Sequence, residues 1–283
     1  MDDLIQTRTV RIGDLAFTVD VAGPESGAPV LLLHGFPQSR HAWGRQLSVL
    51  AAAGYRAIAP DQRGYSTDAR PNGAEHYSVP AIVGDALAIM DAMGAPRFHL
   101  VGHDWGGHIA WTLAAQAGER VISLAVLSRP HPAAFAQGMA KDPEQAGRSR
   151  HHSTLLESGA ADAMLADGLA GFRAMFARQG VPAEDARAYI AALSEPGALE
   201  AAIHWYRAAA AMRSRDAPPV SMPTLYVWGD ADTTVGRAAA EGTGAFVQAA
   251  YRFEEVAGAG HFLTDQVPEV VNRLLVAHLA AQG

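Results

Sequence analysis

Apolar residues occur in short continuous runs along most of the chain, each bounded by glycine, proline or other turn-forming residues. Runs of Val, Ile, Leu and Ala without alternation are typical of strands buried on both faces of a parallel sheet. Helical patterns at 42–53, 81–93, 107–117, from 237 and at 268–279 separate these runs, which predicts a doubly wound α/β sheet. The predicted buried strands are 29–33, 55–59, 98–101, 121–127, 224–228 and 252–256.

Two regions depart from this alternation. Residues 7–12 and 16–21 are separated by Gly13 and Asp14 and predict an antiparallel hairpin. Residues 130–217 are alanine-rich, helical in pattern and poor in strand signals. The simplest architecture is an α/β core formed by 1–129 and 218–283, with a helical cap inserted at 130–217. An apolar pocket wall in the cap is expected from Met139, Met164, Phe172, Met175 and Phe176.

Composition excludes several classes of function. The 283 residues carry a net charge of -7 and a single lysine, Lys141, which disfavours a nucleic-acid surface. The absence of cysteine excludes disulfides, thiolate metal sites and a cysteine nucleophile. No apolar run approaches the roughly 20 residues of a membrane helix, and no signal sequence follows Met1. We therefore expect a cytoplasmic protein with no membrane partner; a homodimer would be unsurprising.

The segment 100–107 has the pattern of a nucleophile elbow. A predicted strand leads into a turn marked by Gly102 and Gly106, and a predicted helix follows. In such an elbow the glycines flank the nucleophile because the strained turn leaves no room for side chains. The central residue is usually serine, but here it is Asp104.

Two further residues complete a triad in the order nucleophile, acid, histidine. Asp232 follows the strand that ends at Gly229, and His261 follows the next strand. This is the chain order of the α/β-hydrolase triad. Asp230 competes with Asp232 for the role of the acid and would replace it if the pattern were shifted by two residues.

These motifs resemble the α/β-hydrolase superfamily, and within it the branch of epoxide hydrolases and dehalogenases with an aspartate nucleophile. The resemblance covers nearly the whole chain and implies the α/β-hydrolase fold. In that family the acid lies three residues after the strand-ending glycine, which selects Asp232. The other segments that carry the resemblance are His34-Gly35-Phe36-Pro37, Asp61-Gln62-Arg63-Gly64-Tyr65-Ser66, Asp142-Pro143-Glu144-Gln145 and His204-Trp205-Tyr206-Arg207.

An aspartate nucleophile suits attack on a saturated carbon. Its carboxylate is ionised at neutral pH without a base and would leave an alkyl ester on Asp104. Hydrolysis of that ester needs a general base, for which His261 is suited, with Asp232 orienting the imidazole. The resemblance places the oxyanion hole at the backbone N–H groups of Phe36 and Trp105.

The leaving group distinguishes the enzyme classes of this branch. Opening an epoxide needs an acid, and Tyr206 matches one of the two cap tyrosines of epoxide hydrolases. Where the second is expected, the chain has His151, which either donates a hydrogen bond in its place or is a solvated residue. Expected substrate contacts are Phe36, Trp105, Arg129, His151, Trp205, Tyr206 and Phe262.

The sequence therefore favours a cofactor-free epoxide hydrolase acting on a small molecule. A dehalogenase acting on a haloalkane or haloacid is the alternative, with Trp105 or Trp205 binding halide. Arg129 either binds an acidic substrate or pairs with a cap acid. A ligand-binding protein without turnover is the third hypothesis, although such a protein has no need of all three triad residues. No histidine spacing indicates a metal site.

Overall fold

A single mixed sheet forms the centre of the computed structural model, which describes residues 5–148, 151–211 and 217–282. The strand order is β1-β2-β4-β3-β5-β6-β7-β8. All neighbouring pairs from β4 to β8 are parallel, and β2 is antiparallel to both β1 and β4. The predicted doubly wound sheet with an N-terminal hairpin is thereby confirmed. The strands are β1 (Ile5–Ile12), β2 (Leu15–Ala22), β3 (Pro29–Leu33), β4 (Arg56–Pro60), β5 (Phe98–His103), β6 (Val121–Leu127), β7 (Thr224–Gly229) and β8 (Tyr251–Val256).

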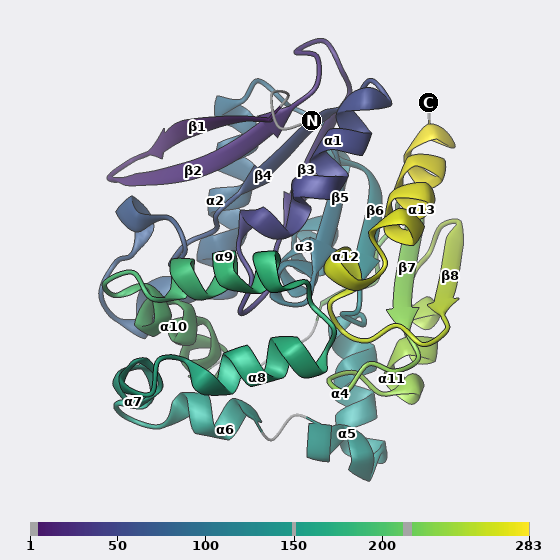
Figure 1. The fold of residues 1–283 in the computed structure, drawn as a ribbon. Coiled ribbons are helices and arrows are strands. Elements are labelled where there is room, and N and C mark those ends of the chain that lie inside the picture. Colours follow the sequence, from purple (N-terminus) through teal and green to yellow (C-terminus); the bar gives the residue numbers. More distant parts are fainter. Residues whose placement is uncertain (1–4, 149–150, 212–216, 283) are drawn as a thin grey trace.

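Helices cover both faces of the sheet, which explains why its strands lack polar alternation (Figure 1). Along β3, Leu31 and Leu33 pack with α2 and α3, whereas Val30 and Leu32 pack with α1 and α13. The helices that flank the sheet are α1 (Gly44–Ala52), α2 (Val79–Ala92), α3 (Trp105–Gln116) and α13 (Pro268–Ala280). The shorter helical elements of this core are η2 (Arg40–Trp43), η3 (Thr67–Ala69), η4 (Ala74–Tyr77), η5 (Gly118–Arg120), α11 (Arg237–Gly242), η6 (Thr243–Phe246) and α12 (Leu263–Gln266).

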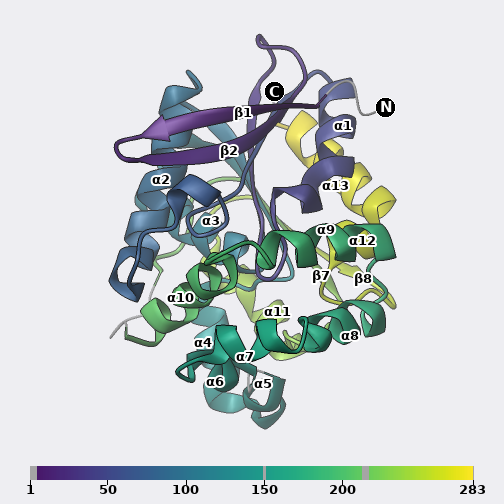
Figure 2. The ribbon, with the colours of Figure 1, turned by 60° about the vertical axis from the view of Figure 1, so that its left-hand side comes forward.

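Between β6 and β7, the regular elements of the described residues are all helices, joined by short loops, apart from an isolated bridge at Val220. Its helices α5 to α10 gather beyond the carboxyl ends of the parallel strands, on the side opposite the two termini (Figures 1 and 2). We propose that this insertion is the predicted cap, with boundaries near 130 and 217. Its helices are α4 (Pro132–Lys141), α5 (Pro143–Arg148), α6 (His151–Leu156), α7 (Ala160–Ala166), α8 (Ala170–Arg178), α9 (Ala183–Leu193) and α10 (Ala198–Ala211).

Several element boundaries differ from the sequence prediction by one or two residues, and two of them lie at the elbow. Strand β5 continues to His103 instead of ending at 101, because Gly102 and His103 stay in register with β6. Helix α3 begins at Trp105 instead of 107, since the carbonyl of Asp104 already accepts the N–H of His108. The turn is therefore tighter than the glycine pattern indicates.

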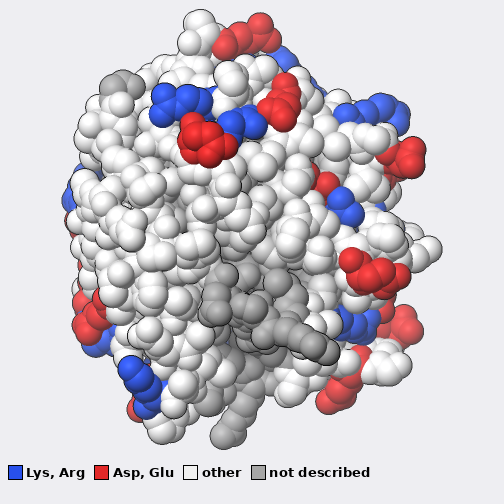
Figure 3. Space-filling view, turned by 180° about the vertical axis from the view of Figure 1, so that it is seen from behind, with Lys and Arg blue, Asp and Glu red and all other residues white. Residues whose placement is uncertain are grey.

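The molecular surface carries charges of both signs. On the face seen in Figure 3, Lys and Arg are interspersed with Asp and Glu, and no continuous basic surface appears among its described residues. Within the described ranges, no helix is both long and apolar enough to span a bilayer.

Candidate active site

Asp104 forms the turn between β5 and α3, at the carboxyl edge of the central strands. Its backbone has φ 50° and ψ −119°, a left-handed conformation that costs a non-glycine residue about 1–3 kcal/mol. Gly106 has no room for a side chain, because a Cβ there would collide with the carbonyl oxygen of Leu33. This strained turn presents the Asp104 carboxylate at the end of the sheet, as a nucleophile elbow requires.

The three predicted triad residues meet in the structure. Nε2 of His261 lies 3.4 Å from Oδ2 of Asp104, and its Nδ1 lies 2.9 Å from Oδ2 of Asp232. All three side chains are buried. Asp230 is exposed and instead accepts the backbone N–H of Gly258 at 2.6 Å. The geometry thus selects Asp232 over Asp230 as the partner of the histidine.

The charges of this triad stabilise one another. Burial lowers the pKa of His261, but the Asp232 and Asp104 carboxylates outweigh it and raise the pKa to about 10. Burial works against ionisation of Asp104, yet the hydrogen bond and charge of His261 hold its pKa well below the usual range. In the resting protein the triad is therefore an imidazolium between two carboxylates at neutral pH.

Two buried side chains fix the main chain of His261. Nε2 of His103 and Oγ of Ser128 both lie 2.8 Å from its carbonyl oxygen. Burial, together with the nearby charge of His261, lowers the pKa of His103 to about 4. His103 is therefore a neutral imidazole that donates from Nε2, which gives this elbow residue a definite structural role.

The predicted oxyanion hole already holds one oxygen of Asp104, the predicted nucleophile. The backbone N–H of Phe36 donates to Oδ1 of Asp104 at 2.9 Å. The N–H of Trp105 is the first of α3, a position where helix geometry provides no intrahelical acceptor. Because Phe36 binds Oδ1, Oδ2 is the oxygen that faces His261.

A buried histidine shapes the loop that carries Phe36. Nδ1 of His34 lies 3.0 Å from the Gly35 carbonyl, and its Nε2 accepts the backbone N–H of Gln62 at 3.2 Å. The side-chain amide of Gln62 donates a hydrogen bond of 2.6 Å to the His34 carbonyl. Burial lowers the pKa of His34, which suits a neutral ring that donates from Nδ1 and accepts at Nε2. The two motifs that carry Phe36 and Gln62 are thereby joined.

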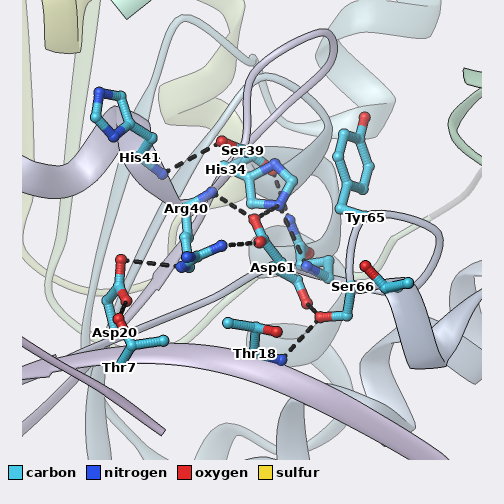
Figure 4. Close-up of polar contacts among 12 residues, drawn as sticks. Thr7, Thr18, Asp20, His34, Ser39, Arg40, His41, Asp61, Tyr65 and Ser66 are labelled. Atoms are coloured by element: carbon cyan, nitrogen blue, oxygen red, sulfur yellow. Dashed lines mark hydrogen bonds and ion pairs between the residues drawn. The ribbon is translucent and has the colours of Figure 1, made fainter. Parts of the chain in front are cut away.

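An ion-pair cluster stands behind this loop (Figure 4). Arg40 bridges Asp20 of β2 and Asp61 after β4. The Asp61 carbonyl also accepts Oγ of Ser66, which in turn accepts the N–H of Thr18. Sequence reasoning missed Arg40 and Asp20, because neither belongs to a motif and only folding brings them together.

The triad opens into a cavity of about 840 Å³ that is roofed by cap helices. Tyr206 and Phe262 line it together with Asp104 and His261. Three of the five residues predicted for an apolar wall also line it: Met164, Phe172 and Met175. Phe176 is buried in the cap core instead, and Met139 borders a separate hollow.

Tyr206 is held by aromatic neighbours within this cavity. Its ring packs edge-on against Phe36, with centroids 5.2 Å apart, and against Trp105 at 5.1 Å. Burial raises the pKa of the Tyr206 hydroxyl well above its ordinary value, and the nearby Asp104 carboxylate adds to this. The phenol is therefore protonated at neutral pH and suited to donate.

Two residues predicted to contact substrate lie elsewhere. Trp205 is buried in the core, where its indole N–H donates to the Arg63 carbonyl at 2.8 Å. The guanidinium of Arg129 stacks on Phe135 at 4.2 Å and borders the separate hollow. Neither is among the described residues that line the 840 Å³ cavity. Both predictions followed sequence position alone, which does not give the direction of a side chain.

Two other predicted contacts have different outcomes. The Trp105 side chain packs edge-on against Tyr206 and is not among the described residues that line the cavity. The side chain of His151 lies outside the described residues, so its role stays a prediction. Further polar residues that line the cavity were missed, because cap helices and loops place them without a motif: Arg148, Thr154, Asp167, Arg178, Gln179, Thr233, Thr234 and Gln266.

Asp265, four residues after His261, is bonded to Tyr189 of the cap, and its burial predicts a stability that depends on pH. Its carboxylate accepts Nε2 of Gln38 at 2.7 Å and Oη of Tyr189 at 2.8 Å. Burial raises the pKa of Asp265 to about 7, although the Tyr189 hydrogen bond lowers it. Between pH 4 and 7 the folded protein therefore holds a proton that the unfolded chain has released. We expect this group to lower the free energy of unfolding by at most about 4 kcal/mol as pH rises through that window.

Denaturant unfolding at pH 5 and pH 8 measures this effect. The Asp265→Asn variant should lose most of the difference, because its amide does not titrate. Replacing Asp162, an exposed carboxylate of the cap, by Asn should leave the difference in place. Equal pH slopes for wild type and Asp265→Asn would contradict the prediction.

Among the described residues, no group of three or more His, Cys, Asp or Glu is arranged to hold a metal ion. The chemistry available at this site is that of the carboxylates, the imidazole, the phenol and the backbone N–H groups. These are the groups that the predicted nucleophile, base with its orienting acid, proton donor and oxyanion hole require.

The alpha/beta hydrolase fold family matches residues 28–266 of the chain. The chain is an α/β hydrolase. It is 32% identical over 272 residues to Epoxide hydrolase 4 of Mus musculus, covering 92% of this chain and 75% of that one. It is 31% identical over 322 residues to Epoxide hydrolase A of Mycobacterium tuberculosis, with 98% and 96% covered.

A solved structure agrees with these relatives. A chain described among novel epoxide hydrolases from metagenomes of hot environments aligns with a TM-score of 0.85 and 27% identity, over 97% of this hydrolase and 98% of that chain. The predicted resemblance is confirmed: this hydrolase belongs to the α/β-hydrolase superfamily and is close to the epoxide hydrolases.

Proposed function

We propose that this hydrolase converts epoxides to vicinal diols through a covalent ester on Asp104. One observation carries the proposal: Asp104, His261 and Tyr206 line the same cavity, and His261 lies between the carboxylates of Asp104 and Asp232. The similarity to proteins named epoxide hydrolases supports the choice of substrate.

In the first half-reaction, Oδ2 of Asp104 attacks an epoxide carbon. The carbon–oxygen bond of the ring breaks, and the departing oxygen takes the proton of Tyr206. Because Oδ1 keeps the hydrogen bond from Phe36, it becomes the carbonyl oxygen of the new ester. The carbonyl then already lies in the oxyanion hole.

In the second half-reaction, water attacks the ester carbonyl while His261 accepts its proton. A histidine with a pKa near 10 is a poor base at neutral pH, but that value includes the charge of Asp104. Esterification removes this charge, so the pKa of His261 falls, and the proton of the imidazolium passes through solvent to the Tyr206 phenolate left by ring opening. The neutral imidazole then accepts the proton of the attacking water. Collapse of the tetrahedral intermediate releases the diol and restores the Asp104 carboxylate, and His261 is again the imidazolium of the resting protein.

The environment of the cavity supports an epoxide over an organohalide. A halide leaving group needs N–H donors that cradle it, yet the indole N–H of Trp205 is engaged by the Arg63 carbonyl. Arg129, the candidate for a haloacid carboxylate, stacks on Phe135 outside the cavity lining. The departing oxygen of an epoxide needs the proton that Tyr206 can donate, whereas a halide ion leaves without one.

A mixed panel of aryl and alkyl epoxides, haloalkanes and haloacids tests the proposal. Diol and halide release are recorded side by side, with Asp104→Ala as the blank. We expect diol from the wild type and none above the blank in the variant. Halide release without diol would assign the enzyme to the dehalogenases, and binding of panel compounds without either product would indicate a binding protein.

Removing the Tyr206 hydroxyl should slow ring opening selectively. The Tyr206→Phe variant keeps the ring that packs on Phe36 and Trp105 but loses the proton donor. We expect ester formation to slow by roughly 10²- to 10⁴-fold, as measured by rapid quench in a single turnover.

Tyr189→Phe is the matched control, because it removes a buried cap hydroxyl that binds Asp265 and does not line the cavity. It should leave the rate of ester formation within a factor of about two to three. An unchanged rate in Tyr206→Phe would remove this tyrosine from the mechanism.

A further inference from the structure

A buried glutamine of the cap, Gln145, is hydrogen-bonded to the loop that carries the catalytic acid. The side chain of Gln145, in α5, is fully buried. Its Nε2 donates to the Thr234 carbonyl at 2.9 Å, and its Oε1 accepts the Gly236 N–H at 2.8 Å. The amide thus binds one acceptor and one donor of the same backbone segment, much as a neighbouring strand would.

The backbone segment to which Gln145 is hydrogen-bonded also orients Asp232. Oδ1 of Asp232 accepts the backbone N–H groups of Thr234 at 2.6 Å and Val235 at 3.0 Å, which leaves Oδ2 to bind His261. Arg148, one turn further along α5, donates to the Asp232 carbonyl. An unbroken chain of hydrogen bonds therefore runs from Gln145 through this loop to the imidazole.

We propose that Gln145 is a positioning residue for the catalytic acid, so that the cap completes the triad as well as roofing the cavity. The inference rests on the proposed two-step function. The helix packs directly on the loop, since a Cβ added at Gly236 would lie 3.2 Å from Oδ2 of Asp142 and 3.4 Å from Oε1 of Gln145. Without the two hydrogen bonds from Gln145, the loop constrains the direction of the Asp232 carboxylate less.

Because Gln145 acts through Asp232, we expect its replacement to slow one half-reaction and not the other. Ester formation uses Asp104 and Tyr206, neither of which is held by Gln145. Ester hydrolysis uses His261, whose pKa and orientation depend on Asp232. A displaced acid slows hydrolysis on the order of 10- to 100-fold, the usual cost of a misplacement near 1 Å.

Two substitutions disturb the contact to different degrees. Gln145→Ala removes both hydrogen bonds. Gln145→Glu keeps the size and the acceptor for Gly236 but opposes the Thr234 carbonyl with an oxygen. The matched control is Gln46→Ala, because Gln46 is a fully buried amide that joins α1 to Asn272 of α13, away from the active site.

Single-turnover kinetics with an epoxide separates the two rates. In both Gln145 variants we expect ester formation within about threefold of wild type and hydrolysis slowed by 10- to 100-fold, so that the ester accumulates. Gln46→Ala should keep the wild-type ratio of the two rates even if its unfolding temperature falls. An unchanged ratio in the Gln145 variants, with or without lost stability, would overturn the proposal.

A second readout does not depend on turnover. NMR of ¹⁵N-histidine-labelled protein follows the His261 ring and its titration in the resting enzyme. We expect a lower His261 pKa in the Gln145 variants and an unchanged one in Gln46→Ala. If Gln145→Ala fails to fold, Gly236→Ala is the second variant. Its added Cβ crowds Oε1 of Gln145 and should also lower the pKa of His261. A wild type that forms no diol would reject the proposed function, whereas an unmoved titration would reject the role of Gln145.

Discussion

Turnover in Asp104→Ala is expected to fall by roughly 10⁴-fold or more, because the nucleophile itself is removed. The fold should persist, since most of the buried residues of β5 and α3 on either side of the elbow are apolar and are unchanged. In the same variant the pKa of His261 should fall, because one of the two carboxylates that raise it is gone. Product assays and an NMR titration of His261 measure the two effects.

The control for this variant is Asp230→Ala. Asp230 is an exposed acid of the loop after β7, and its bond to Gly258 lies outside the triad. Its replacement should change turnover by less than about threefold and leave the His261 titration in place. Substantial turnover in Asp104→Ala would show that another group attacks the substrate.

The His261→Gln variant should stop the reaction at the covalent ester. The first half-reaction does not require a base, because the Asp104 carboxylate attacks directly, and the backbone N–H of Phe36 still donates to it in this variant. The second requires one to activate water, and glutamine does not accept a proton at neutral pH. We expect steady-state turnover to fall by roughly 10²- to 10⁴-fold, and the intact mass to rise by the mass of the epoxide.

His99→Gln serves as the matched control, because His99 is a buried histidine bonded to Ser123 and remote from the triad. The His99→Gln variant should convert the epoxide to diol without accumulating the covalent ester. Peptide mapping must place the adduct of His261→Gln on Asp104. An adduct on another residue, or none under conditions where wild type reacts, would contradict the two-step mechanism.

Much of the fold was predictable because its signals are local. Apolar runs such as that of β3 arise because both faces of the strand are buried, as the placement of Leu31 and Val30 in opposite layers confirms. The elbow was predictable for a similar reason, since glycines are required where backbones approach closely. Its exact limits were not, because the conformation of Asp104 shortens the turn to one residue.

The triad could be proposed from order and spacing, since each member follows a strand whose end lies at the same edge of the sheet. The cap was harder, because helices there are placed by packing rather than by a repeating strand pattern. Tyr206 and Trp205 are neighbours in sequence, yet successive residues of α10 point in different directions. One lines the cavity and the other is bonded to the core.

Arg40 and Asp20 gave no sequence signal, and the segment that contains Gln145 carried a resemblance but no role for this residue. The Arg40–Asp20 ion pair and the Gln145–Gly236 hydrogen bond join residues that lie 20 and 91 positions apart in the chain. Their importance follows only from the loops that they hold, one bearing Phe36 and the other Asp232. Spacing rules describe residues that act on substrate, whereas residues that orient them are found from contacts.

The most direct test of the central proposal is a single turnover in H₂¹⁸O with enzyme in excess over epoxide. If Asp104 is the nucleophile, the new oxygen of the diol comes from its carboxylate. We then expect an unlabelled diol from the first turnover and ¹⁸O in the peptide that contains Asp104. A labelled diol with an unlabelled peptide would show that water attacks the epoxide directly and would contradict the ester mechanism.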